Sequence, residues 1–207
     1  MKPFVRERGA IIPLDRADVD TDQIVPKQFL KRIERTGYGD VLFNDWRYDA
    51  SGAPRPDFVL NQKPYAGGGV LVAGRNFGCG SSREHAVWAL ADHGIRAVVA
   101  PSFADIFRGN SLKRGLLPVV LPEPAVRALL DLALEDPGVQ ATVDLETQEV
   151  SAGDLRFTFS IDSFERRTLL DGLDDIALTL QHAPAISAYE EQRPDWMPGI
   201  PREAAPA

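Results

Sequence analysis

The distribution of apolar positions in the middle of the chain predicts alternating strands and helices. Runs of mostly apolar residues at 70–73, 96–100 and 117–121 are typical of short strands buried on both faces. The segments between them, 81–92 and 102–113, have the length and the glycine stops of helices. Because strands alternate with helices of crossover length, we expect the strands to be parallel.

The pattern changes to period-two alternation in the last third of the chain. Polar and apolar residues alternate in 142–145, 149–151 and 157–161, with short polar turns between these segments. Such alternation indicates antiparallel strands with one buried face and one exposed face. Two further helices are predicted over 163–171 and 174–192.

The remaining segments are consistent with a single domain. An apolar run at 10–14 predicts a first strand, and the stretch 44–64 combines turn residues with three aromatic residues, which is typical of an ordered loop packed on the body. We expect one domain over 1–194 and a loose C-terminal tail over 195–207. The predicted fold class is α/β, with a parallel central sheet and an additional antiparallel segment.

Composition narrows the range of functions. The 207 residues are 44% hydrophobic and 26% charged, which is typical of a globular protein with its own core. A net charge of −7 and a pI of about 5.0 argue against a nucleic-acid partner. No apolar run reaches the length of a membrane span and no signal-peptide pattern is present, so we expect no membrane association and a cytoplasmic location. One cysteine and three dispersed histidines predict no metal site made by this chain alone.

The loop after the strand at 70–73 carries the candidate chemistry. It contains three glycines, which permit sharp turns and close approach to a ligand. Ser81 and Glu84 have the spacing of a capping box, which predicts a helix start whose free N–H groups favour an anion. Arg83 suits bidentate recognition of a carboxylate there. A purely structural capping role for the serines explains the same pattern, and both interpretations stay open.

The motif GCGSSREHA at 78–86 resembles the signature of the aconitase swivel-domain family. The resemblance runs over the chain to about Pro194 and extends to small subunits of bacterial 3-isopropylmalate dehydratase. The further motifs that carry it are DTDQI at 20–24, FNDWR at 43–47, PSFAD at 101–105, GLLP at 115–118, GLD at 172–174 and LTLQH at 178–182.

This resemblance implies a layered β/β/α swivel fold and a hydro-lyase activity. In this family 2-isopropylmalate is isomerised to 3-isopropylmalate by dehydration and rehydration, in leucine biosynthesis, with a [4Fe–4S] cluster acting as a Lewis acid on the leaving hydroxyl. A cluster needs at least three cysteine thiolates, and this chain has one. The resemblance therefore implies that this chain holds no cofactor, that the cluster belongs to a large subunit, and that the two chains form a heterodimer acting on a small dicarboxylate.

Positions in the motifs also imply roles for individual residues. Ser81 matches the catalytic base, which acts as an alkoxide, and Ser82 and Arg83 match residues that hold a substrate carboxylate. Thr21 and Asp22 match a second active-site segment, and the resemblance implies that both contribute to substrate binding. Within this segment, Asp22 is expected to bond to a histidine or a water of the partner's half.

Phe29 and Leu30 follow this second segment, and we expect them to form an apolar wall for the isopropyl group of the substrate. The alternative is that both belong to the domain core. The register of this segment, the breadth of the substrate range and the stoichiometry of the complex stay open.

Two other functions are compatible with the same residues. A thiol just before a helix start can have a lowered pKa, so Cys79 with His85 as base predicts a thiol-dependent enzyme. A small buried side chain in a tight loop is the structural interpretation of Cys79. A non-catalytic carboxylate-binding domain is the other alternative, and it predicts ligand binding without turnover.

Overall fold

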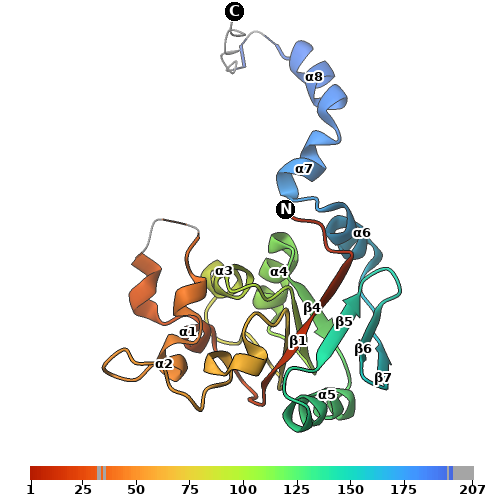
Figure 1. The fold of residues 1–207 in the computed structure, drawn as a ribbon. Helices are drawn as coiled ribbons and strands as arrows, with labels where there is room; N and C mark the ends of the chain where they lie inside the picture. The colour runs from red at the N-terminus through yellow and green to blue at the C-terminus, as the bar shows by residue number, and fades with distance from the viewer. Residues whose placement is uncertain (32–33, 35, 195, 198–207) are drawn as a thin grey trace, which may run out of the picture. The chain divides into compact units, whose positions relative to one another are not determined.

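The computed structural model describes residues 1–31, 34, 36–194 and 196–197. The chain divides into two compact units, Met1–Leu173 and Asp174–Ala207. The first unit contains all seven strands of the described residues, and the second contains two short helices (Figure 1). Of the predicted tail at 195–207, all but Trp196 and Met197 lies outside the described residues.

One seven-stranded sheet of order β4-β3-β2-β1-β5-β6-β7 forms the centre of the first unit. Its first strand, β1, pairs in parallel with β2 on one side and antiparallel with β5 on the other. This arrangement confirms the predicted parallel central sheet with an added antiparallel segment, and it places Pro118 in the edge strand β4, where a missing N–H is tolerated. The strands are β1 (Arg6–Leu14), β2 (Val70–Ala73), β3 (Ala97–Ala100), β4 (Leu117–Val120), β5 (Gln140–Asp144), β6 (Glu149–Ala152) and β7 (Leu155–Thr158).

Alternate side chains of the parallel strands pack into two separate cores. On one face, Leu71 and Val98 join the core that includes α3 (Glu84–Asp92). On the other, Val72 joins the core that includes α5 (Glu123–Glu135). Because both faces of the sheet are covered, its parallel strands are continuous apolar runs in the sequence.

The remaining elements of the first unit are short. The segment 44–64 is ordered as predicted, because Phe58, Leu60 and the adjacent Tyr65 are buried against the body. The helices not yet given are α1 (Thr21–Ile24), α2 (Asn44–Arg47), α4 (Asp105–Arg114), α6 (Ser163–Asp171) and the 3-10 turns η1 (Lys27–Lys31), η2 (Gly39–Val41), η3 (Val59–Asn61) and η4 (Lys63–Tyr65).

The prediction of one helix over 174–192 is wrong. The segment forms two helices, α7 (Asp175–Leu180) and α8 (Ala183–Glu191). Pro184 explains the break, because it has no N–H to donate to the carbonyl of Leu180. Pro184 lies instead in the first turn of α8, where a missing N–H costs nothing.

Candidate active site

Three loops meet at the carboxyl ends of β1, β2 and β3, the edge at which open α/β sheets commonly bind ligands. The loops after β2 and β3 are joined by backbone hydrogen bonds from Phe77 N to Ser102 O at 3.1 Å and from Ala104 N to Phe77 O at 3.0 Å. Asn76 N donates to Ser102 Oγ at 2.8 Å. Ser102 therefore joins the two loops, and the N-cap residue of α4 is Ala104.

The loop that carries Ser81 is fastened to the segment after β1. Gly78 N donates to Val19 O at 2.8 Å, and Thr21 N donates to Cys79 O at 2.9 Å. The hydroxyl of Thr21 donates to Ser81 O at 2.9 Å. The two segments predicted to share an active site are thus in direct contact, although about sixty residues separate them along the chain.

Two glycines make this close contact possible. Gly78 and Gly80 have φ values of +77° and +85°, in the left-handed region that glycine adopts without strain. A Cβ atom at Gly78 would overlap the ring of Phe107, and one at Gly80 would overlap the carboxylate of Asp20. The glycine spacing before the serines is therefore a steric requirement of the loop.

The predicted capping box of Ser81 and Glu84 is wrong. Helix α3 begins at Glu84 with Arg83 as its N-cap residue, and no side chain caps it. The bond from Thr21 holds Ser81 outside the helix, and Arg83 is extended at φ −141°, so the first turn forms later than the spacing predicts. A capping box does form at α1, between Asp20 and Gln23.

The absence of a side-chain cap at α3 changes the interpretation of the two serines. Ser81 and Ser82 are exposed, and neither hydroxyl bonds to any residue that the structure describes. The structural capping role is therefore excluded for Ser81, and its hydroxyl is accessible to a ligand at the carboxyl edge of the sheet.

Arg83 and Asp22 form an ion pair between Arg83 Nη1 and Asp22 Oδ1. The Arg83 side chain is only 12% exposed, whereas that of Asp22 is 32% exposed, so the guanidinium is largely removed from water beside the Ser81 loop. Lys27 Nζ lies 3.6 Å from Asp22 Oδ2 and is well exposed. The largely buried guanidinium of Arg83 has further N–H donors in the same plane, beyond the one from which Asp22 accepts.

Thr21 is 2% exposed, and its hydroxyl is bonded to Ser81 O. Its place in the structure therefore favours a positioning role for the Ser81 loop. Thr21→Val keeps the shape and removes this bond. If Ser81 takes part in catalysis, we expect kcat to fall about 10-fold, and the free energy of unfolding should fall by about 1 kcal/mol. KM should change little, because no substrate contact is lost.

The matched variant Thr21→Ser keeps the hydroxyl and should restore kcat. Steady-state kinetics and thermal unfolding of each variant distinguish a positioning role of Thr21 from a purely structural one. A lower stability with unchanged kcat would leave Thr21 as an ordinary core residue.

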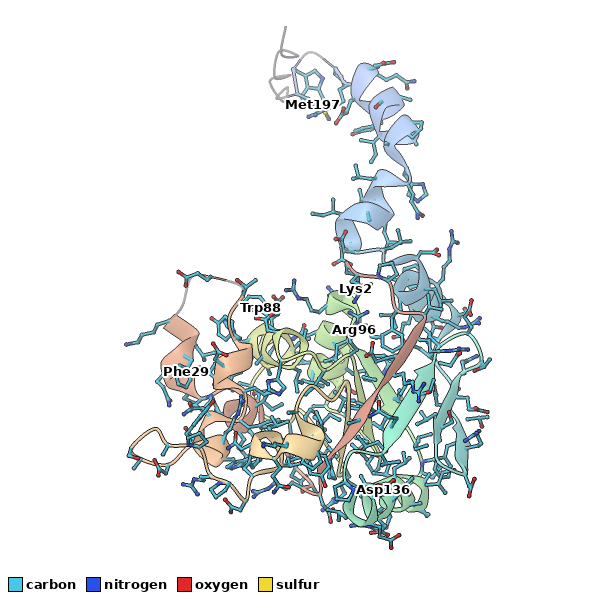
Figure 2. The ribbon with its side chains drawn as sticks, viewed as in Figure 1. Lys2, Phe29, Trp88, Arg96, Asp136 and Met197 are labelled. Carbon is cyan, nitrogen blue, oxygen red and sulfur yellow. The ribbon has the colours of Figure 1, made fainter. Side chains whose placement is uncertain are left out.

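Phe29 and Leu30 lie in η1 and are partly buried against the core that includes α3 (Figure 2, Phe29). They follow the Thr21–Asp22 segment along the chain, and each has part of its side chain exposed. Their assignment to an isopropyl pocket stays a prediction, since core packing and a role as pocket wall are both compatible with partial burial.

The expectation of a lowered pKa for Cys79 is wrong. Burial raises the pKa of its thiol above the ordinary value, and the carboxylates of Asp20 and Asp18 raise it further. Because α3 begins at Glu84, the thiol is also not at a helix start. The premise of a thiol-dependent enzyme is therefore contradicted.

His85 is a packed ring on α3. Its ring centroid lies 5.3 Å from that of Tyr38 and 4.7 Å from that of Trp88, which Figure 2 labels. Burial is the largest cause that lowers the pKa of His85. These contacts favour a structural histidine, as the apolar surroundings in the sequence indicate.

The contact between Asp18 and Asn76 is not predicted by the sequence. Asn76 Nδ2 donates to Asp18 Oδ1 at 2.8 Å and so joins the loops after β1 and β2. Both residues have positive φ, 54° and 55°, which Asp and Asn tolerate better than other residues. The sequence indicates only that Asp18 and Asn76 are residue types that tolerate positive φ. No local sequence pattern indicates that the loops after β1 and β2 meet.

No group of three or more His, Cys, Asp or Glu side chains within the described ranges is arranged to hold a metal ion. In that same part of the chain, no helix has both the length and the apolar character needed to cross a membrane.

Comparison with known proteins identifies the family. The model of the aconitase C-terminal domain matches residues 1–124. The model described as LeuD_N matches 127–163, and the model for the C-terminal domain of the 3-isopropylmalate dehydratase small subunit matches 175–198.

The crystal structure of 3-isopropylmalate dehydratase (leuD) from Methanocaldococcus jannaschii aligns with a TM-score of 0.63 at 27% identity, over 89% of this chain and 99% of that chain. The holo form of aconitase X from Thermococcus kodakaraensis aligns with a TM-score of 0.38 at 16% identity, over 72% of this chain and 91% of that one, which is too distant to carry an argument. The predicted resemblance and the swivel fold are confirmed. The chain belongs to the aconitase C-terminal domain family, and within it is similar to small subunits of 3-isopropylmalate dehydratase.

Proposed function

We propose that this chain is the small subunit of a 3-isopropylmalate dehydratase, active only with its large subunit. The reaction removes water from 2-isopropylmalate and adds it back so that the hydroxyl group moves to the neighbouring carbon. The observation that carries the proposal is Ser81, an exposed serine outside any helix cap, held by Thr21 beside the Arg83–Asp22 pair.

Ser81 is proposed as the base that removes a proton from the carbon next to a substrate carboxylate. A serine hydroxyl is a very weak base, so its alkoxide needs a preorganised positive field. Arg83, largely shielded from water, and the start of α3 at Glu84 supply positive charge close by in the chain. The proton removed and the hydroxide that leaves make up the water lost in the first half of the reaction.

Ser82 and Arg83 are proposed to hold a carboxylate of the substrate. A guanidinium recognises a carboxylate through two parallel N–H bonds, which orient it as well as bind it. Asp22 is proposed to hold the Arg83 guanidinium from one side. The remaining N–H groups of that guanidinium are then able to face the substrate.

The cluster is proposed to belong to the large subunit. One cysteine cannot replace the three thiolates that a [4Fe–4S] cluster needs, so the residues of this chain do not fit it. When bound in the partner, the cluster supplies Lewis-acid activation of the leaving hydroxyl. The residues of this chain are proposed to bind the substrate, to orient it and to transfer a proton.

The experiment that tests this proposal against a thiol enzyme uses Cys79→Ser. Mixed with a cluster-loaded large subunit, the variant should convert 2-isopropylmalate at no less than about half of the wild-type rate, because the thiol takes no part in the chemistry and its raised pKa keeps it protonated. Absorbance of the unsaturated intermediate measures the rate. Loss of activity in Cys79→Ser with normal assembly would favour the thiol enzyme.

Leu30 tests substrate selection. Leu30→Ala should lower kcat/KM for 2-isopropylmalate about 10-fold, since a wall of the isopropyl pocket loses contact area worth about 0.8 kcal/mol per methyl-sized group. A homologue with methyl in place of isopropyl should be affected less.

The matched control for Leu30 is Val59→Ala, because Val59 is also partly buried against the same core. It should lower the melting temperature without changing the ratio of the two substrates. If Leu30→Ala behaves in the same way as this control, Leu30 belongs to the core and the pocket assignment is wrong.

A further inference from the structure

The described residues from Asp174 to Met197 include exposed apolar side chains and no buried residue. Neither α7 nor α8 contains a buried position. Half of the large hydrophobic residues that are exposed in the described chain lie in this segment: Ile176 at 72%, Leu180 at 62%, Ile186 at 37%, Tyr189 at 65% and Trp196 at 78%. An apolar concentration of this kind marks an interaction surface.

The two helices are too short to be stable without a packing partner. Helix α7 has six residues and α8 has nine, and isolated helices under about 12 residues are marginal in water. Ile176 and Leu180 are spaced i, i+4 and therefore share one face of α7, while Ile186 and Tyr189 are spaced i, i+3 and share one face of α8. Each helix thus presents an apolar face of the type that docks into a groove.

We propose that the segment 174–197 is a docking surface that binds an apolar groove of the large subunit. This inference rests on the proposed function, because it takes the partner from that assignment. The family model that matches 175–198 describes a domain of 3-isopropylmalate dehydratase small subunits, whereas the match of the general aconitase C-terminal domain model ends at residue 124. The segment is therefore associated with chains that have a separate large subunit.

Charge favours a different chain over a second copy of this one. Among its described residues the segment has four acidic side chains (Asp174, Asp175, Glu190 and Glu191) and one basic side chain, Arg193. In a symmetric dimer the same acidic surface would occur on both sides of the interface, and like charges brought together weaken association. A groove bordered by Lys and Arg on another chain complements this surface.

The test measures association of full-length variants with the cluster-loaded large subunit by surface plasmon resonance. The double variant Leu180→Asp with Tyr189→Asp places two charges on the apolar faces. The matched control, Gln181→Asp with Ser187→Asp, adds the same charge at two exposed positions. Gln181 is the C-cap residue that follows α7, and Ser187 lies about 130° around α8 from the centre of its apolar face. We expect the Kd to rise at least about 100-fold for the first variant and to stay within about 3-fold for the control.

Thermal unfolding should be the same for both variants, because no buried side chain is changed. Equal affinity of the two variants for the large subunit would overturn the docking surface. The proposal would also be overturned if the wild-type chain self-associates and only the variant Leu180→Asp with Tyr189→Asp dissociates it. The segment 174–197 would then bind a second copy of this chain. Turnover of 2-isopropylmalate by the wild-type mixture tests the proposed function separately from the docking surface. If turnover is present, the proposed function holds even when the docking surface is wrong.

Discussion

Ser81→Ala is expected to reduce turnover of 2-isopropylmalate by the assembled enzyme about 10²–10⁴-fold, the range for loss of a general base. The melting temperature and the affinity for the large subunit should stay close to wild type. The reason is structural: the Ser81 hydroxyl bonds to no described residue, and the loop is held through the Ser81 carbonyl, which alanine keeps. Initial rates, thermal unfolding and binding to the large subunit are measured on the same preparation.

Ser160→Ala is the matched control for this variant, because Ser160 is also exposed and lies outside the three loops of the site. It should leave turnover unchanged. Near wild-type turnover in Ser81→Ala, accompanied by a lower melting temperature, would show that Ser81 stabilises the loop and performs no chemistry.

Arg83→Lys is expected to raise KM for 2-isopropylmalate about 10–100-fold. An ammonium retains the charge and can still pair with Asp22, but it cannot present two parallel donors to a carboxylate. Hydrogen bonds to charged groups contribute about 1.5–3 kcal/mol each, and that range sets the expected change. Steady-state kinetics over a wide substrate range measures KM separately from kcat.

Lys27→Met is the comparison variant, because it removes a positive charge near Asp22, whereas Arg83→Lys keeps one. Lys27 lies 3.6 Å from the same carboxylate but is 74% exposed, and exposed ion pairs contribute little. We expect KM to change less than about 3-fold. A change in KM of less than about 3-fold in Arg83→Lys as well would mean that the charge of Arg83 is sufficient and that its two parallel donors do not bind the substrate.

Much of the fold could be predicted because the sheet is buried on both faces. A continuous apolar run such as 70–73 indicates a strand that is covered on both faces. Alternation such as that in 142–145 indicates a strand that is covered on one face. The parallel part followed from the helices between the runs. The break between α7 and α8 was missed although Pro184 marks it, because the flanking residues have the composition of one helix.

The site was harder to predict, since its geometry depends on contacts between distant segments. The Ser81–Glu84 spacing predicts a capping box by local rules, yet a hydrogen bond from Thr21 holds Ser81 outside the helix. No local pattern reveals that bond. The pKa of Cys79 depends likewise on burial and on Asp20, which a sequence read without the fold does not place beside the thiol.

We propose that this chain supplies half of a divided active site. Its most direct test is a titration of a fixed amount of cluster-loaded large subunit with this chain, followed by turnover of 2-isopropylmalate. Turnover should be absent for either chain alone, should rise as this chain is added, and should reach a plateau when every large subunit is occupied. Turnover by this chain alone, or no turnover at any ratio of the two chains, would contradict the account.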